Sequence, residues 1–314
     1  MDIQIDGLIE HLRRRGVRRV GLQFPEGLKR KAYGLAVSLK RAGFEPLVSG
    51  NPCYGACDID HETLAMSDIL VHFGHAPLCG NDRVLFEPVF IAFDIRLLDR
   101  VIPWLKDKRV RVTTTVQHVQ MVHEVLRYLK EQGIDATASV GGSRTPYPGQ
   151  VLGCSFGAAR GGSDEILFIG SGLFHPTGIA IATGKRVIAL DPLTGEVREV
   201  SGERFLRRRH AMIERAKGAG SVGILLSTKP GQKRLELARR MAALTERAVV
   251  VVMEEVTPEG LLNLGLDCYV NTACPRLAYD DSIRFAVPVL SPPEFEILCG
   301  VRGWQEYQID EFCQ

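Results

Sequence analysis

Three cysteines have the residue type and surroundings that best fit metal chemistry in this chain. Cys57, Cys154 and Cys274 each lie in a predicted loop, far apart in the sequence. Cysteine thiolates bind zinc and iron–sulfur clusters. The chain has no Cys-x-x-Cys pair, which is the spacing typical of a structural zinc site. The sequence therefore favours an iron–sulfur cluster, and three thiolates rather than four would leave one iron of a [4Fe–4S] cluster open to a substrate.

The five remaining cysteines have less specific interpretations. Cys268 and Cys299 lie in apolar segments and are predicted to be core residues, while Cys313 lies at the end of the chain. Cys53 precedes the first of the three loop cysteines by four residues. It is therefore the strongest alternative ligand. Cys79 is left without an assigned role.

Composition places the chain among ordinary globular proteins. Of its 314 residues 45% are hydrophobic and 24% are charged, and the net charge is +2. Nothing in this balance requires a nucleic acid or a membrane as partner. The N-terminus lacks the basic and apolar regions of a signal peptide, and no apolar run reaches the roughly 18 residues of a membrane span. We therefore expect a cytoplasmic location, where these cysteines would not form disulfides.

A pattern of strand, helix, strand, loop, strand, helix and strand begins three times along the chain. In its first occurrence the helix carries Leu28, Ala32, Leu35 and Leu39 on one face. Alternating strands and helices predict parallel sheets covered on both faces. The strands of the first unit are predicted at 20–23, 46–48, 69–73 and 88–93, and the second and third units begin with strands at 110–114 and 222–226.

We therefore predict an α/β fold of three successive Rossmann-like units, each a four-stranded, mainly parallel sheet flanked by helices. The units are predicted at residues 1–105, 106–210 and 211–314, each with one loop cysteine, and the cluster at their common centre. A single large doubly wound sheet is the alternative. The first two cysteines precede the third strand of their unit, whereas Cys274 follows it. The third ligand must therefore enter from a different loop.

Two similar turns follow the first strands of the first and third units, at 24–27 and 229–232. Ligands of open α/β sheets bind at the carboxyl ends of the strands. A proline at the first helical turn, with free amides behind it, can bind an anion such as a carboxylate or phosphate. An ordinary strand-to-helix turn is the simpler interpretation of either turn alone. The candidate ligand-binding residues here are Pro25, Glu26, Ser227, Lys229, Gly231 and Gln232.

A glycine pair follows a predicted strand of the second unit. Gly170 and Gly172 would let a ligand approach the backbone closely, although they do not form a Gly-x-Gly-x-x-Gly fingerprint. His175, three residues later, is a further candidate for the site. Its alternative interpretation is a hydrogen-bonded structural histidine.

An ordered set of segments resembles the archaeal Dph2 family of diphthamide synthesis, the 2-(3-amino-3-carboxypropyl)histidine synthases. These segments lie at 21–28, 54–58, 72–75, 153–154, 168–176, 227–232 and 271–276. They cover nearly the whole chain. The resemblance implies a homodimer of three Rossmann-like domains, with a [4Fe–4S] cluster bound by Cys57, Cys154 and Cys274.

The resemblance also implies an activity. The cluster of the family binds S-adenosylmethionine at its open iron and, after reduction by an external electron donor, cleaves the bond from sulfur to the γ-carbon. The resulting 3-amino-3-carboxypropyl radical adds to C2 of a histidine in translation elongation factor 2, the first step of diphthamide biosynthesis. On this interpretation Lys229, with the amides near Gly231 and Gln232, would hold the methionine carboxylate. Gly170, Gly172 and His175 would face the adenosine or the target imidazole.

Three other functions stay open at this point. Quinolinate synthase also combines three α/β units with a cluster on three cysteines, and it would make this chain a condensing dehydratase. A non-catalytic, cluster-bearing partner or electron-transfer subunit is the second alternative, and a metal-free nucleotide-binding module is the third. Release of methylthioadenosine from S-adenosylmethionine would distinguish the first function from these.

Overall fold

The computed structural model describes residues 5–78 and 81–312 and contains three separate sheets. The first has the strand order β2-β1-β3-β4, with all strands parallel. Every residue of β3 is buried, which is typical of a parallel strand covered on both faces. The strands of this first unit are β1 (Arg19–Gln23), β2 (Glu45–Val48), β3 (Ile69–Phe73) and β4 (Val84–Glu87).

The second and third sheets repeat this order, with the first strand beside the second and the third. The second sheet, β6-β5-β7-β8-β9, ends in an antiparallel strand, and the third is β11-β10-β12-β13. The strands of the second unit are β5 (Arg109–Thr114), β6 (Asp135–Thr137), β7 (Glu165–Ile169), β8 (Arg186–Leu190) and β9 (Val197–Val200). Those of the third unit are β10 (Val222–Ser227), β11 (Ala248–Met253), β12 (Cys268–Asn271) and β13 (Val289–Leu290).

Helices connect the strands of each sheet. The α-helices are α1 (Ile5–Arg14), α2 (Ala32–Arg41), α3 (His61–Met66), α4 (Val122–Glu131), α5 (Phe174–Thr183), α6 (Glu203–Ala216), α7 (Leu235–Ala242), α8 (Pro258–Leu264), α9 (Pro275–Tyr279) and α10 (Pro292–Leu298). The 3₁₀ helices are η1 (Glu26–Lys31), η2 (Ile95–Arg100), η3 (Ile102–Trp104), η4 (Val116–Met121), η5 (Gly157–Ala159), η6 (Pro230–Gln232), η7 (Asp281–Arg284) and η8 (Trp304–Glu306). A 3₁₀ helix thus follows the first strand of every unit.

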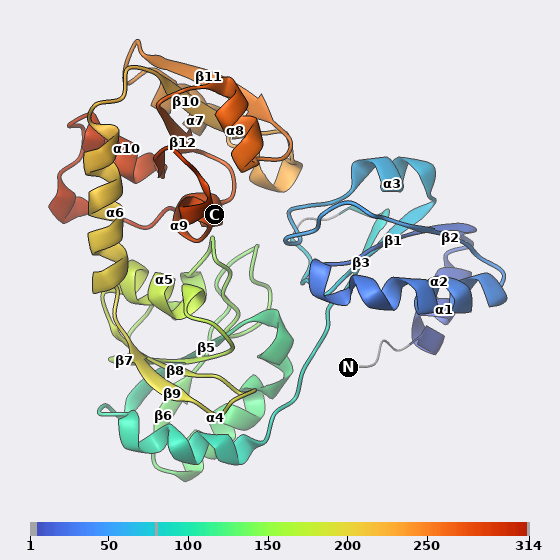
Figure 1. Cartoon of the computed structure of the whole chain (residues 1–314). Coiled ribbons are helices and arrows are strands. Elements are labelled where there is room, and N and C mark those ends of the chain that lie inside the picture. Colours follow the sequence, from blue (N-terminus) through green and yellow to red (C-terminus); the bar gives the residue numbers. More distant parts are fainter. Residues whose placement is uncertain (1–4, 79–80, 313–314) are drawn as a thin grey trace.

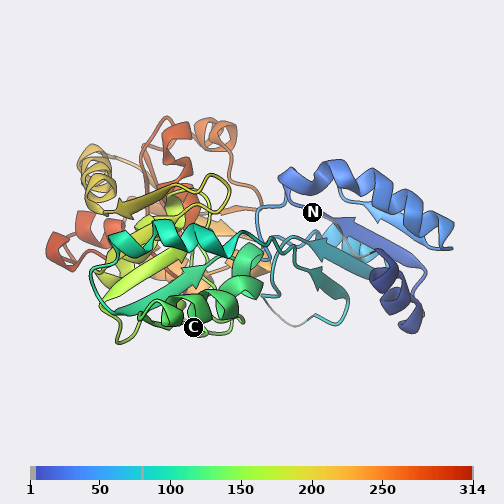
Figure 2. The ribbon, with the colours of Figure 1, turned by 90° about the horizontal axis from the view of Figure 1, so that it is seen from below.

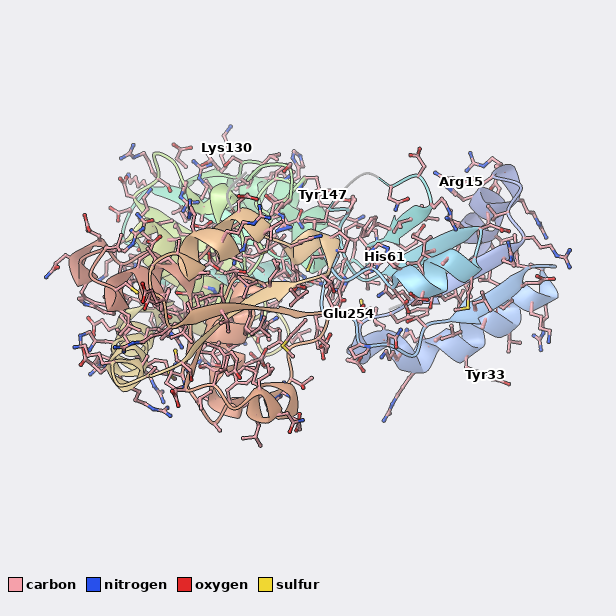
Figure 3. All side chains as sticks on the ribbon, turned by 90° about the horizontal axis from the view of Figure 1, so that it is seen from above. Arg15, Tyr33, His61, Lys130, Tyr147 and Glu254 are labelled. Carbon is pink, nitrogen blue, oxygen red and sulfur yellow. The ribbon has the colours of Figure 1, made fainter. Side chains whose placement is uncertain are left out.

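The second and third units pack closely, whereas the first unit stands apart (Figures 1 and 2). One apolar core contains residues of both the second and third units, among them Phe168 and Tyr269, while the first unit has its own core around Leu22 and Phe73. In Figure 3, Arg15 and Tyr33 lie at the end of the first unit that is far from the other two. The first unit therefore meets the others through its loops.

The predicted α/β fold with three mainly parallel sheets is confirmed, with two differences in detail. The antiparallel β9 was not predicted. The fourth strand of the first unit lies at Val84–Glu87, so its prediction at 88–93 was wrong. Pro88 cannot donate a ladder hydrogen bond, and the backbone N–H of Ile91 donates to the carbonyl of Gln117 (2.6 Å). The apolar segment 88–93 is thus a connection that packs on the second unit.

The predicted limits of the three units, 1–105, 106–210 and 211–314, stay a prediction. Each sheet lies within one of them. However, Leu98 and Val101 of the first range pack in the core of the second sheet. Among the described residues, no helix has both the length and the apolar composition that a membrane span requires.

Candidate metal centre

The three loop cysteines lie in the wall of one cavity of about 270 Å³. Cys57 belongs to the loop between β2 and α3, and Cys154 to the loop between β6 and η5. Cys274 comes after β12 and caps the N-terminus of α9. The structure therefore brings together one thiol from each unit, with the third entering from a different loop as the sequence predicted. Their role as cluster ligands stays a prediction.

Burial raises the pKa of all three thiols. The pKa of Cys154 rises to about 11 and that of Cys274 to about 12, and in both cases the neighbouring cysteines add to the effect of burial. The pKa of Cys57 is raised for the same main reason. Three adjacent, half-buried thiolates repel one another unless a cation lies between them. A metal cluster would supply that positive charge, so the donor set fits one.

Two polar side chains contact the sulfurs. The Gln232 amide nitrogen lies 3.4 Å from Cys57 Sγ, and an Arg144 guanidinium nitrogen lies 3.9 Å from Cys154 Sγ. Arg144 also donates to the carbonyl of Gly231 (2.6 Å). Such N–H groups stabilise negative charge on cluster sulfurs. Arg144 was not predicted as a site residue. Its place in a loop of small residues is the signal in the sequence that could have indicated it.

Gly231 is needed for a close approach between the first and third units. A β-carbon at this position would lie 2.5 Å from Cys57 Cβ and 2.6 Å from its Cα. Both distances are shorter than real carbon contacts, and the second involves backbone. The third unit therefore packs directly on the cysteine loop of the first unit, and only glycine fits there.

None of the predicted ligand residues of the two matching turns lies in the cavity wall. Lys229 pairs with Asp58 (2.8 Å) and with Glu255 (2.6 Å), which raises its pKa against the effect of burial. The hydroxyl of Ser227 accepts a hydrogen bond from the Lys229 backbone N–H. Because two carboxylates already neutralise its charge, Lys229 links the first and third units in this structure.

In the first unit, Pro25 precedes η1 and packs near Gly74, and Glu26 pairs with Lys29 (2.7 Å). Neither side chain lines the cavity. Their predicted contacts with a ligand, like that of Lys229, stay predictions.

Of the three candidates that follow β7, only His175 lines the cavity. Its ring is nearly parallel to that of Phe168, and burial lowers its pKa to about 4. Gly172 has a φ of +80°, which favours glycine. Arg276 also lines the cavity, beside Cys274, and pairs with Asp280 (2.7 Å).

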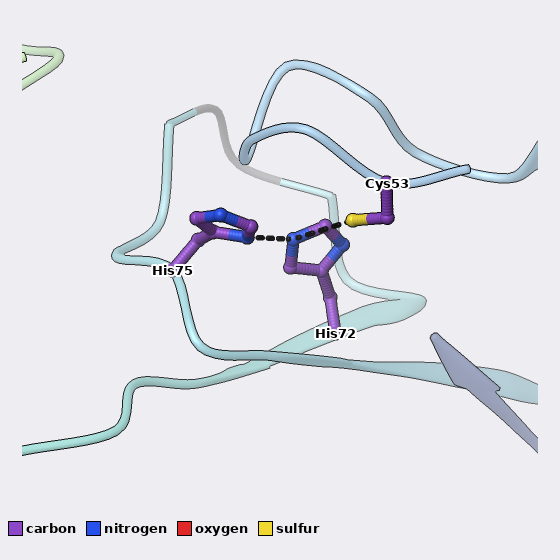
Figure 4. Close-up of side chains that lie close together, drawn as sticks. All are labelled: Cys53, His72 and His75. Carbon is purple, nitrogen blue, oxygen red and sulfur yellow. Dashed lines mark hydrogen bonds between the residues drawn. The ribbon is translucent and has the colours of Figure 1, made fainter. Parts of the chain in front are cut away.

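Two histidines of the first unit, His72 and His75, lie next to each other and to Cys53 (Figure 4). His72 Nε2 is 2.8 Å from His75 Nδ1 and 3.9 Å from Cys53 Sγ, and the ligand atoms of the three residues lie within 4.8 Å of one another. His75 lines the cavity, but Cys53 does not. No role was predicted for these histidines beyond their place in the segments that carry the family resemblance.

The predictions for the cysteines outside this site can be compared with the structure in part. Cys268 and Cys299 pack with the core of the third unit, which confirms their predicted place. Cys79 and Cys313 lie outside the described residues.

Comparison with known proteins identifies the family. The sequence profile of the diphthamide synthesis proteins matches residues 24–309. This chain belongs to that family. The family resemblance seen in the sequence is thereby confirmed.

Relatives match over most of their length. The 2-(3-amino-3-carboxypropyl)histidine synthase of Pyrococcus horikoshii is 39% identical over 97% of this chain and 92% of its own. The corresponding subunit 1 of Schizosaccharomyces pombe is 30% identical over 98% of this chain and 76% of its own. The crystal structure of Dph2 from Pyrococcus horikoshii with a 4Fe–4S cluster matches with a TM-score of 0.93 and 38% identity, covering 99% and 94% of the two chains. The diphthamide synthesis protein described here is thus an enzyme of the transferase type.

Proposed function

We propose that this chain is a 2-(3-amino-3-carboxypropyl)histidine synthase. It would transfer the 3-amino-3-carboxypropyl group of S-adenosylmethionine to C2 of a histidine in translation elongation factor 2, the first step of diphthamide biosynthesis. The observation that carries this proposal is the meeting of Cys57, Cys154 and Cys274 in one cavity. It is supported by relatives with this name and by a structural neighbour described with a 4Fe–4S cluster.

In this proposal the three thiolates hold a [4Fe–4S] cluster. When bound, the cluster supplies an open iron for the sulfonium substrate and the electron for a non-standard radical cleavage. The protein supplies the remaining interactions. Gln232 and Arg144 direct N–H groups at two of the sulfurs, and thereby stabilise their charge.

The polar residues of the cavity wall suggest where the substrate parts lie. Arg276 lies in the wall beside Cys274, and its guanidinium, which pairs with the partly exposed Asp280 (2.7 Å), suits the methionine carboxylate. Lys229 would have to release Asp58 or Glu255 to take that role. His175 remains our candidate for contact with the adenosine or the target imidazole, and Gly170 and Gly172 would shape the backbone beside it.

The proposal extends to partners. We propose a homodimer that acts in the cytoplasm on elongation factor 2 and takes electrons from an external donor. Size-exclusion chromatography with light scattering measures the dimer directly, and a monomer at micromolar concentration would remove that part of the proposal.

The experiment for the activity is anaerobic reconstitution followed by incubation with dithionite, S-adenosylmethionine and archaeal elongation factor 2. We expect methylthioadenosine and a factor whose target histidine carries one 3-amino-3-carboxypropyl group, in equal amounts. A reconstituted protein that binds iron and sulfide but releases no methylthioadenosine would refute the proposed function.

A further inference from the structure

A hydrogen-bonded series in the first unit fixes the proton positions of a cavity histidine. It begins at Gln23, which is buried. The Gln23 amide nitrogen donates to the carbonyl of Asp58 (2.6 Å), and its oxygen accepts from the backbone N–H of Asp60 (3.2 Å). These two contacts determine which end of the amide is oxygen. His72 Nδ1 lies 2.9 Å from that oxygen and must therefore carry a proton.

The proton position on His72 determines that on His75. His72 is buried, and desolvation lowers its pKa to about 3, so its ring is neutral and Nε2 has a free lone pair. His75 Nδ1, 2.8 Å away, must then donate to it. Burial also lowers the pKa of His75 to about 4, so its ring is neutral and its Nε2 is unprotonated.

The unprotonated nitrogen of His75 is available in the cavity. Figure 4 shows it on the side of the ring turned away from His72. Within residues 5–78 and 81–312 no hydrogen bond to this atom is formed, and it is not among the buried atoms that lack a partner. His75 lines the same cavity as the three cysteines.

We propose that His75 is the catalytic base that accepts the C2 proton of the target imidazole, with His72 and Gln23 as its positioning residues. This inference rests on the proposed function. In the net reaction the bond from sulfur to the γ-carbon breaks, a carbon–carbon bond forms at C2, and the C2–H bond breaks. Methylthioadenosine leaves as a neutral thioether, no oxidant or reductant is consumed overall, and one proton remains.

That proton goes to His75 Nε2. Because burial lowers the pKa of His75 to about 4, the protonated ring gives the proton up to water and returns to its neutral form.

His175, the other cavity imidazole, lacks these features. In the part of the chain that the structure describes, its ring nitrogens have no hydrogen-bond partner, and it packs against Phe168 and Phe174. Burial and the positive charge of Arg276 oppose its protonation, whereas the Asp280 carboxylate favours it. The pKa of either ring is lowered to about 4, so what distinguishes His75 is the hydrogen bond that fixes the position of its ring.

A metal ion at Cys53, His72 and His75 is a weaker interpretation of the same group. Two nitrogen ligands at about 2.0–2.1 Å from a tetrahedral zinc lie about 3.4 Å apart. The two facing nitrogens here are 2.8 Å apart, which is a hydrogen-bond distance. Burial raises the pKa of Cys53 to about 12, so it is a thiol rather than a thiolate.

The first test is the proton position in the cluster-free protein, measured by long-range ¹H–¹⁵N spectra. We expect His75 with a protonated Nδ1 and a bare Nε2, and a mixture of tautomers in Gln23→Leu. A protonated Nε2 in the unchanged protein would overturn the inference. So would one zinc per chain that is lost in Cys53→Ser.

The second test compares His75→Asn with His123→Asn, whose exposed histidine lies on α4 away from the cavity. The asparagine amide can still donate to His72 but has no second nitrogen base. With iron content unchanged, we expect His75→Asn to release methylthioadenosine within about twofold of the unchanged protein. The ratio of modified histidine to methylthioadenosine should fall at least about tenfold, in line with the usual contribution of a general base.

The outcomes separate the two proposals. If the unchanged protein releases no methylthioadenosine, the proposed function fails. If the unchanged protein makes both products in equal amounts and His75→Asn does so as well, the base assignment alone fails. Loss of both products in equal proportion in His75→Asn also overturns it, since a base for C2 acts only on the target histidine.

Discussion

The loop that carries Cys274 differs from the loop that carries Cys57 in what holds it in place. The Cys274 loop is fixed within the third unit: Asn271 donates to the Cys274 carbonyl (2.8 Å), and Arg234 donates to the carbonyls of Thr272 and Ala273. No side chain in the described ranges donates to Cys274 Sγ.

The Cys57 loop is held within its own unit, where Gln23 donates to the carbonyl of Asp58 (2.6 Å), and also by contacts from another unit. Gly231 packs on the Cys57 backbone, Gln232 donates to its sulfur, and Lys229 pairs with the adjacent Asp58. All three belong to one turn of the third unit. The turn at 229–232 of the third unit therefore supports the cysteine loop of the first unit, whereas the Cys274 loop is supported within its own unit.

The largest effect expected is loss of the cluster when any of the three cysteines is removed. Cys57→Ala, Cys154→Ala and Cys274→Ala should each leave two ligands and lose cluster absorbance and activity by at least about a hundredfold. Cys53→Ala is the matched control, since its sulfur does not line the cavity, and it should keep a normal iron content. Normal clusters in all three variants would remove the ligand assignment.

Thiol alkylation in the cluster-free protein tests the electrostatics of the site. Since the pKa of Cys154 rises from 9.0 to about 11, its thiolate fraction at pH 8 is about a hundredfold below that of an ordinary cysteine. Iodoacetamide labelling followed by mass spectrometry should show slow reaction at Cys154 and Cys274. The rate should rise about tenfold per pH unit through pH 9 without a plateau.

The sign of the effect on stability follows from the same shifts. The folded chain holds these thiol protons more tightly than the unfolded chain, so the free energy of unfolding should fall as pH rises above 9.0. In the labelling experiment, rapid reaction of Cys274 with a plateau below pH 9 would contradict the raised pKa of its thiol.

The docking of the first unit can be weakened at Gly231. In Gly231→Ala the new β-carbon must displace the Cys57 backbone, so we expect iron retention after reconstitution to fall about tenfold. Gly34→Ala, in α2 with nothing within 4 Å, is the control and should retain iron normally. If both alanine variants retain iron equally, the first unit does not depend on this contact.

Local patterns were sufficient to predict the units but not the contacts between them. Apolar segments predicted the strands of each sheet. Helical spacing of apolar residues, such as that of Leu35 and Leu39, predicted the helices that cover it. The segment 88–93 looks like a strand by propensity, and only its packing on the second unit decides otherwise. Arg144 was missed because its partner Gly231 lies 87 residues away in the sequence. His75 was missed because His72, which contacts it, is itself oriented by Gln23, 49 residues before His72.

The smallest effect is expected at Lys229, where the two interpretations of this residue diverge. If Lys229 links the first and third units, Lys229→Met loses the pairs with Asp58 and Glu255. Cluster retention should then fall about twofold to threefold with an unchanged KM for S-adenosylmethionine. The pair with Glu255 is partly exposed, so added salt should reduce the difference from the unchanged protein. As a carboxylate ligand, the same substitution would instead raise KM at least about tenfold at normal iron content. Arg276→Met is the matched comparison, because its guanidinium lines the cavity and should give the KM effect that Lys229→Met lacks.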